Sequence, residues 1–474
     1  MCQSVKGGGE RDVNTIRPDH EVIIIGAGPG GICAGAQLTT RGIEDFLILD
    51  RGDGFGGSWR DNHYPGLGVD VPGFCYQYSF RKNPDWSWMF PKGDEVLAYH
   101  REVAAEFELG ARARFGVCVV REVWDERNGW WEVHTDGHGV ITGRFVISAI
   151  GAYIHAKDDP GIDGLGDFRG EILRPDSWDH DYDLSGKRVA VIGTGASSVQ
   201  ISPSIAPVVQ QLSVFQRTPV WCLPKPDMAM RPWMRRGLRI RGVGTSIAFA
   251  TNVVVETVLR VVYQTPKALF RPGARAFDAV GRGVYRAYLR AIVKDKRTRT
   301  ELAPSYGVLG KRPTLSNDYV PNFNRDNVEL VTSAITTLTP HGIRTADGVE
   351  RDVDAIVLAT GYELFSDPES YHHGAVVGRG GFDLADFYNT QRLQAYQSVS
   401  VPGLPNRWML VGPYSWIGTG WHELVEISSG HAVNVIDHAR REGHQIAEVS
   451  QTAHERYHRK VREQGRTSRT TSAR

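Results

Sequence analysis

Two segments of the chain share one pattern, in which a short apolar run leads into a glycine-rich turn and then a helix-like stretch. They lie at residues 21–40 and 188–205, and their glycine turns begin at positions 26 and 193. In each copy a second apolar run ends 24 residues after the first glycine, at Asp50 and at Arg217. Such an internal repeat of strand–helix–strand units predicts an α/β protein with two Rossmann-like dinucleotide-binding domains.

The first glycine turn has the surroundings that a dinucleotide site needs. Gly26 permits a tight turn, Gly28 lets the backbone approach a pyrophosphate, and Gly31 lets the helix pack closely on the strand. The N-terminus of the helix would then face the phosphates with its positive end. Asp50, at the end of the next strand, would accept hydrogen bonds from a ribose hydroxyl.

The second glycine turn differs from the first at its ribose-reading position. Gly193 and Gly195 repeat the turn glycines, and Ser198 is a small residue that the helix packing tolerates. Arg217 can pair with a 2′-phosphate, and Thr218 adds a hydroxyl donor, so this site should prefer NADPH over NADH. The alternative is that Arg217 is a solvated residue at a strand end. Two sites with different ribose readers imply two cofactors, and FAD with NADPH is the natural combination.

Two further apolar runs, 145–151 and 355–361, resemble each other and end in glycine. We interpret them as parts of one domain, into which the second domain is inserted, with the chain returning before Ala355. Residues 228–300 are rich in Arg, Ala and Val and should form a helical insertion. The expected ranges are 20–155 and 335–450 for an FAD-binding domain, 156–334 for an NADPH-binding domain, and 1–19 and 451–474 for flexible tails.

Composition excludes several classes of protein. With 55 Lys+Arg against 54 Asp+Glu the formal net charge is +1, which gives no general attraction for nucleic acid. The five cysteines are scattered, which argues against a disulfide framework or a zinc site, and we expect no bound metal. The polar N-terminus favours a cytoplasmic protein. The most apolar stretch, residues 243–262, reads either as a core-covering helix or as a surface that touches a membrane or admits apolar substrates.

Several motifs resemble those of the flavin-dependent Baeyer–Villiger monooxygenases, within the flavin-containing monooxygenase class. The resemblance covers roughly residues 20–435. Its most specific part is Gly56-Gly57-Ser-Trp59-Arg-Asp-Asn-His-Tyr-Pro-Gly66, followed by Asp70 and a Tyr-Ser-Phe sequence at 78–80. Phe215-Gln-Arg217-Thr218-Pro, Lys311-Arg312-Pro and Ala-Thr-Gly361 match three further family segments. Gly57, Trp59 and Gly361 are therefore expected beside the cofactors.

The resemblance implies a reaction and roles for several residues. NADPH would reduce FAD, dioxygen would add to the flavin C4a carbon, and the resulting peroxyflavin would convert a ketone to an ester or lactone. Arg312 would stabilise the negative peroxide and the developing oxyanion, Asp70 would hold Arg312 in place, and Lys311 would lie near the 2′-phosphate. Molecular oxygen and a bulky, apolar carbonyl compound are the expected small-molecule partners.

Two segments depart from the family pattern. The family fingerprint is Phe-x-Gly-x-x-x-His-x-x-x-Trp, and here Phe168, Gly170 and Trp178 match, but Arg174 occupies the histidine position. A permanent cation there weakens the case for Baeyer–Villiger chemistry, which leaves oxygenation of nitrogen or sulfur, or an uncoupled NADPH oxidase-like flavoprotein, as alternatives. The stretch after Gly412, from Trp416 to Glu423, also differs, and its His and Glu residues should be structural.

Overall fold

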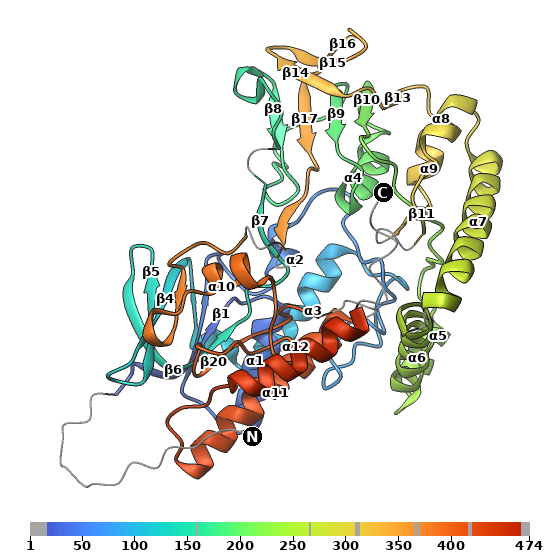
Figure 1. The fold of residues 1–474 in the computed structure, drawn as a ribbon. Coiled ribbons are helices and arrows are strands. Elements are labelled where there is room, and N and C mark those ends of the chain that lie inside the picture. The colour runs from blue at the N-terminus through green and yellow to red at the C-terminus, as the bar shows by residue number, and fades with distance from the viewer. Residues whose placement is uncertain are drawn as a thin grey trace.

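The computed structural model describes residues 17–157, 160–264, 267–308, 313–364, 367, 370–415 and 420–465. Within these ranges two main sheets lie one beside the other, each with helices packed on it (Figure 1). The chain passes from the first sheet to the second and back. This architecture confirms the predicted α/β fold with two Rossmann-like units and a helical region.

The first sheet is built around the first glycine turn. Its order is β19-β4-β5-β6-β1-β2-β3, with β20 beside β6, and β1, β2, β3, β6 and β20 run parallel. Residues 22–25 are apolar on both faces and buried, as expected for a parallel strand with both faces covered. The strands are β1 (His20–Ile25), β2 (Phe46–Asp50), β3 (Ala113–Phe115), β4 (Val119–Asp125), β5 (Trp130–Thr135), β6 (Gly139–Ser148), β19 (Val376–Val377) and β20 (Arg407–Met409).

Helices α1 (Pro29–Thr40), α3 (Gly93–Glu106) and α11 (Trp421–Glu442) cover one face of this sheet, and their apolar residues form its larger core. Small residues of α1 let α11 approach closely. The Sγ atom of Cys33 lies 3.3 Å from the Oγ atom of Ser429 on α11. The remaining short elements of this part are α2 (Ser58–Asp61), η1 (Leu109–Arg112), η4 (Arg379–Gly381) and α10 (Leu384–Gln391).

The second sheet is built around the second glycine turn and is parallel throughout, in the order β13-β10-β9-β17-β8. Helices α4 (Ala196–Ile205) and α9 (Tyr319–Asn322) pack on it, and an antiparallel three-stranded sheet lies at its end. The strands are β8 (Glu171–Leu173), β9 (Arg188–Ile192), β10 (Gln211–Phe215), β13 (Val328–Val331) and β17 (Ala355–Leu358), with β14 (Ile335–Thr339), β15 (Gly342–Thr345) and β16 (Glu350–Asp352) in the smaller sheet.

The expected return of the chain before Ala355 is wrong. Strand β17 is a member of the second sheet, where Ile356 pairs with Ala190 of β9 and Ile172 of β8. The run 145–151 that resembles it belongs to β6, which lies beside β1 in the same way. The resemblance therefore reflects the internal repeat, since each glycine-turn strand has an equivalent neighbour. The segment 335–358, which we assigned to the FAD-binding domain, belongs with the second sheet.

The two crossings between the sheets lie together. Strand β7 (Tyr153–Ala156) leads out of the first sheet and β18 (Tyr362–Leu364) leads back, and they pair antiparallel with Tyr362 opposite Ala156. η2 (Leu165–Asp167) follows the first crossing. This double connection sets the place where the two units meet.

Helices form the region between the glycine turn of the second unit and its later strands. They are α5 (Pro232–Arg239), α6 (Val243–Gln264), α7 (Lys267–Ile292) and α8 (Lys296–Glu301), flanked by the short parallel pair β11 (Cys222–Leu223) and β12 (Thr314–Leu315). They stand at one side of the molecule (Figure 1). Among the described residues, no helix combines the length and the apolar character that crossing a membrane requires.

The expectation of a flexible tail from residue 451 is wrong for residues 451–465, which form α12 (Gln451–Gly465). His454 of this helix is buried, and its Nε2 lies 2.9 Å from Oε1 of Gln394. Burial of such side chains offsets the entropy of ordering the helix. At the other end, the backbone N–H of Asp19 donates to Thr142, so order begins before β1; residues 1–16 and 466–474 lie outside the described ranges.

Candidate active site

A cavity of about 1950 Å³ lies where the two units meet. Both glycine turns line it, at the carboxyl ends of β1 and β9, together with the loop that follows α2 and the crossing strands. Ligands of open α/β sheets bind at this edge of the strands. The fold therefore brings the two predicted nucleotide sites to one shared space.

Two glycines of the first turn, Gly26 and Gly31, have no room for a side chain. Gly26 has φ = +110°, and a Cβ there would lie 2.5 Å from the carbonyl oxygen of Ala149. A Cβ on Gly31 would lie only 1.8 Å from the carbonyl oxygen of Gly26. Both distances are impossible for real atoms, so these glycines perform the turning and packing roles expected from the sequence.

Gly28 and Gly57 form a cradle between the first turn and the loop before α2. A Cβ on Gly57 would lie 2.8 Å from the Cα of Gly28, and Gly57 has φ = +53°. Helix α1 begins directly after Gly28, with no side-chain cap and no acidic residue in its first turn. Its first N–H groups are therefore available for an anion, and the backbone of both glycines leaves the approach open. These features fit the pyrophosphate of a dinucleotide.

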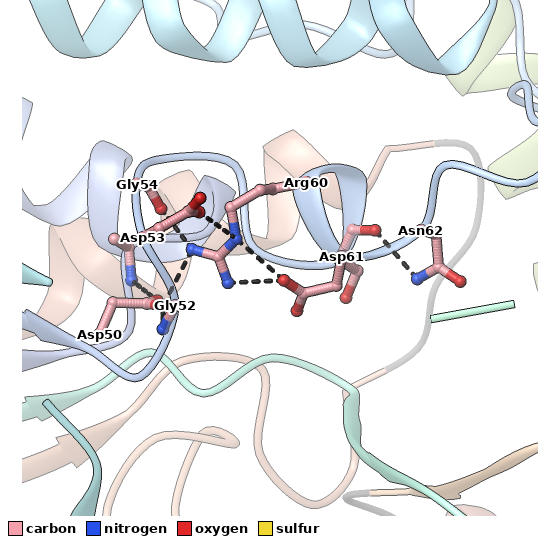
Figure 2. A network of polar contacts seen from close by, with 9 residues as sticks. Asp50, Gly52, Asp53, Gly54, Arg60, Asp61 and Asn62 are labelled. Carbon is pink, nitrogen blue, oxygen red and sulfur yellow. Dashed lines mark hydrogen bonds and ion pairs between the residues drawn. The ribbon is translucent and has the colours of Figure 1, made fainter. Parts of the chain in front are cut away.

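Asp50 is buried at the end of β2, and its carboxylate is held by several donors. Oδ2 accepts from the backbone N–H of Ala27 at 2.6 Å, and Oδ1 accepts from the N–H of Gly52 at 2.8 Å. The Arg60 guanidinium adds a bond of 3.1 Å from Nη1 to Oδ1 (Figure 2). The predicted ribose reader is thus fixed in place by its neighbours.

Arg60 is a residue that the sequence reading missed. Its guanidinium also donates to Asp61 from Nη2 at 2.6 Å and to the carbonyl oxygen of Gly54, and it lies 3.6 Å from Asp53 (Figure 2). Burial opposes the charge, but hydrogen bonding to Asp61 and the nearby carboxylates outweigh it, so the Arg60 pKa lies above its usual value. The spacing of the sequence motifs does not indicate this role, because Arg60 acts through contacts with residues 50–54, which belong to a separate turn.

The second turn repeats the geometry of the first. Gly193 has φ = +114°, and a Cβ there would lie 2.3 Å from the carbonyl oxygen of Ala359, as Gly26 does with Ala149. Gly195 faces open space, and α4 begins after it with no side-chain cap. Ser198 is fully buried in α4, with its hydroxyl 3.5 Å from that of Ser202, so it packs as a small residue must.

Arg217 lies just beyond β10, on the wall of the cavity, and its side chain is exposed. Among the described residues no carboxylate forms an ion pair with it. Thr218 lines the same wall, and its carbonyl oxygen accepts from the hydroxyl of Thr194 at 2.8 Å. This arrangement leaves a cationic group next to the second turn, in the position that Asp50 occupies in the first unit.

Aromatic residues form the cavity wall near Trp59. The Trp59 Nε1–H donates to the hydroxyl of Tyr76 at 3.0 Å, and both residues line the cavity. Behind them, the ring of His422 lies edge-on to Tyr76 at 4.6 Å. His422 and His100 stack with their Nε2 atoms 2.9 Å apart, 322 positions apart in sequence, so no local pattern could have shown this pair.

Burial keeps both rings of that pair in the neutral form. It lowers the pKa of His100 to about 3, and burial followed by the charge of His100 lowers the pKa of His422 well below its usual value. Both rings are therefore neutral near pH 7. The neighbouring acids have structural partners, since Glu423 accepts from Asn252 and Glu426 accepts from Ser79. The structural role expected for this segment is consistent with these contacts; Trp416 lies outside the described ranges.

The predicted catalytic pair is only partly described. Asp70 lines the cavity, as does Gly361, which has φ = +97° and accepts from the Lys157 N–H. Arg312 and Lys311 lie outside the described residues. Their assignments therefore stay predictions from the sequence.

The fingerprint segment divides between core and cavity. Phe168 and Trp178 are buried, and a Cβ on Gly170 would meet the carbonyl oxygen of Asp354 at 2.5 Å. Arg174, at the position of the family histidine, lines the cavity and donates from Nη1 to the carbonyl oxygen of Lys157 at 3.1 Å. The matching residues are thus structural, and the one that differs faces the cavity.

The loop after α2 links the two units. Three consecutive side chains reach across to residues of the second unit or of the crossing strand, as follows: Asn62 to Tyr362 at 2.7 Å, His63 to His180 at 2.9 Å, and Tyr64 to Gln200 at 3.0 Å. Gln200 also donates to the carbonyl oxygen of Gly68. These partners lie more than one hundred positions away, so sequence reading could not find them.

The fold and the cavity define a class: an oxidoreductase with two dinucleotide sites that share one reaction space. Comparison with known proteins agrees. Residues 23–267 match the family described as pyridine nucleotide-disulphide oxidoreductase. A Baeyer–Villiger monooxygenase of Pseudomonas aeruginosa is 34% identical over 421 residues, which cover 88% of this chain and 76% of that protein.

Solved structures give the same result. OTEMO in complex with FAD and NADP superposes with a TM-score of 0.83 at 27% identity, covering 95% of this chain and 91% of that one. Cyclohexanone monooxygenase bound to ε-caprolactone gives 0.84 at 27% identity, with 94% and 93% covered. The chain belongs to the Baeyer–Villiger monooxygenases, and it is an FAD- and NADPH-dependent enzyme.

Proposed function

We propose that the enzyme converts bulky, apolar ketones to esters or lactones. The observation that carries this proposal is the single cavity that both glycine turns line, in a chain of the Baeyer–Villiger family. One structural neighbour was crystallised with ε-caprolactone, which is itself a lactone. In the overall reaction ketone, dioxygen, NADPH and a proton give ester, NADP⁺ and water. One oxygen atom enters between the carbonyl carbon and its neighbour, and the other leaves as water.

The unit around the first sheet is the proposed site of FAD. Gly26, Gly28 and Gly57 would receive the pyrophosphate against the uncapped start of α1. Asp50 would accept from a ribose hydroxyl, and Arg60 would hold its carboxylate in position. Bound FAD would supply the redox chemistry, accepting hydride from NADPH and activating dioxygen.

The unit around the second sheet is the proposed site of NADPH. Gly193 and Gly195 would bring the backbone of the α4 N-terminus to the pyrophosphate. Arg217 would pair with the 2′-phosphate, supported by Thr218 and by Lys311. Because Arg217 has no carboxylate partner among the described residues, no ion pair within this unit would have to break first.

Substrate chemistry is assigned to the wall of the cavity near Trp59 and Asp70. Arg312 would provide a fixed positive charge where negative charge develops on oxygen, and Asp70 would orient it. Trp59 and its partner Tyr76 would exclude water on one side of the reacting atoms. A neutral His100–His422 pair behind Tyr76 adds no competing charge to that wall.

Arg174 is the observation that favours a second candidate. It replaces the histidine of the family fingerprint and lines the cavity. If a fixed cation there weakens the hold on NADP⁺ between reduction and oxygenation, part of the NADPH would be consumed without ester formation. Oxygenation of sulfur or nitrogen, or uncoupled oxidase activity, is then the alternative.

The thiols of Cys33, Cys75 and Cys222 are buried and unbridged, which fits the proposed cytoplasmic location.

The test combines a substrate panel with one variant. The holoenzyme is reduced anaerobically with NADPH, mixed with oxygen and either cyclic or aromatic ketones or matched sulfides, and the products are identified. Esters from ketones support the proposal, whereas sulfoxides alone would establish the alternative. Arg312→Ala should still accept hydride anaerobically but lose ester formation, and Arg325→Ala, an exposed arginine elsewhere in the second unit, should behave as wild type. Normal ester formation by Arg312→Ala would refute the assigned role.

A further inference from the structure

Helix α5 and the first turns of α6 present large apolar side chains to solvent. We call this surface the docking face, and it consists of Trp233, Ile240, Ile247, Phe249, Val253 and Val254. Trp233 is 67% exposed, Phe249 is 69% exposed and Val254 is 63% exposed. Helices α5 and α6 contact each other, and several large apolar side chains exposed on two neighbouring helices indicate a contact surface rather than chance exposure.

The outward side of α6 is unlike that of an ordinary surface helix. Residues 243–255 include no charged side chain, although polar residues normally cover the solvent side of a helix. The inward side is already satisfied, because Ala248 is buried with Val71 and Cys75 in a small apolar cluster. Asn252 also bonds to Glu423 at the start of α11. The helix is therefore anchored by one side, and its apolar other side has no partner among the described residues.

Arginines outnumber acidic residues around this face. Residues 228–255 contain five arginines, at 231, 235, 236, 239 and 241, and no aspartate or glutamate, in a chain whose overall formal charge is only +1. Arg239 pairs with Asp85, whereas Arg231, Arg236 and Arg241 are exposed and have no carboxylate partner among the described residues. An apolar surface flanked by arginines is complementary to anionic headgroups above an acyl interior.

We propose that the docking face binds the surface of a bilayer that contains anionic phospholipid, with α5 and α6 lying in the interface. A second copy of the chain is a poorer occupant, because pairing two such faces would bring two arginine clusters together. Trp233 suits the interfacial region, where amphipathic aromatic rings are favoured. The helix would lie on the bilayer rather than cross it, in keeping with the absence of a spanning helix among the described residues.

Docking would place the bilayer one helix away from the cavity. Val71, which packs against Ala248 on the inner side of α6, also lines the cavity wall together with Tyr76. Membrane binding itself does not depend on the reaction that the enzyme catalyses. If the protein fails to bind membranes, the proposed oxygenation is not contradicted. If the enzyme fails to oxygenate ketones, the proposed membrane docking is not contradicted.

The experiment is flotation of the FAD-loaded protein with vesicles. One set contains phosphatidylcholine alone, and the other contains about one third phosphatidylglycerol. We expect binding to the anionic set, weakened by raising the salt concentration. Phe249→Ser with Val254→Ser should abolish it. Arg236→Glu with Arg241→Glu should lower the partition coefficient at least about tenfold, since each arginine near the surface is worth about fivefold.

Matched controls place the same changes elsewhere. Val140→Ser with Val349→Ser removes one exposed valine from β6 and one from the turn before β16, and Arg127→Glu reverses an exposed charge in the β4–β5 turn. Both should float as wild type does. The proposal fails if the wild type does not bind anionic vesicles. It also fails if both docking-face variants bind as the wild type does, provided that their flavin content and melting temperature show that they are folded. It also fails if light scattering shows a dimer that the Phe249 and Val254 changes dissociate. Because the arginine changes are on the surface, they decide the question even if the apolar variant misfolds.

Discussion

Arg217 offers the sharpest test of how the enzyme distinguishes its two nucleotides. The side chain is exposed on the cavity wall, just beyond β10, and no described carboxylate competes for it. Replacement by alanine would therefore remove only its bond to the ligand and leave the fold intact. A charge-assisted hydrogen bond is worth about 1.5–3 kcal/mol, which corresponds to roughly 10- to 150-fold in affinity. NADH lacks the 2′-phosphate, so its binding should change by less than about threefold.

The assay measures KM for NADPH and for NADH during anaerobic flavin reduction, together with the dissociation constant of NADP⁺ from the oxidised holoenzyme. The binding constant gives a readout that does not depend on turnover. Arg325→Ala is the control, because this exposed arginine precedes β13 and thus lies at the opposite edge of the same parallel sheet. If Arg217→Ala lowers the affinity for NADPH and NADH equally, or lowers neither, the assignment of Arg217 to the 2′-phosphate is refuted.

Three other predictions follow from the contacts of the site. Arg60→Leu leaves the buried carboxylate of Asp50 without its charged partner, so the variant should lose FAD more readily, by about tenfold in dissociation constant; retention of flavin on gel filtration equal to wild type would contradict this. The pKa values of His100 and His422 are low in the folded protein. Below about pH 6.5, therefore, these two rings bind a proton only in the unfolded chain. The free energy of unfolding should thus fall by roughly 1.4 kcal/mol per pH unit for each histidine as pH decreases toward 5. His422→Phe should make the melting temperature less dependent on pH in this range, and an unchanged slope would sink the explanation. Arg174→His should raise the ester formed per NADPH consumed, and an unchanged ratio would show that the position is neutral here.

The sequence predicts those parts of the fold that local residue patterns determine. A buried strand, a turn with φ above +100° and a helix without a cap all lie within 20 residues of one another, so Gly26 and Gly193 identified both units. The helices between residues 232 and 301 were likewise visible from composition and periodicity. Local pattern could not say to which sheet the run 355–358 belongs, because each repeat contains an equivalent strand.

The parts that sequence could not predict depend on contacts between distant segments. Arg60 reaches Asp50 only because a four-residue helix turns its side chain back over the end of β2. The stacked histidines come from α3 and α11, and burial rather than any motif sets their charge. Helix α12 has a polar composition that resembles a tail, but a few buried positions such as His454 are enough to hold it in place.

The shared cavity is proposed to direct one atom of dioxygen into a ketone. The most direct measurement supplies the holoenzyme with NADPH, a bulky cyclic ketone and ¹⁸O₂, and follows the product by mass spectrometry. We expect a lactone that contains one ¹⁸O atom, formed in proportion to the NADPH consumed. Unchanged ketone, with one hydrogen peroxide formed from dioxygen for each NADPH oxidised, across the ketone panel, would contradict this expectation.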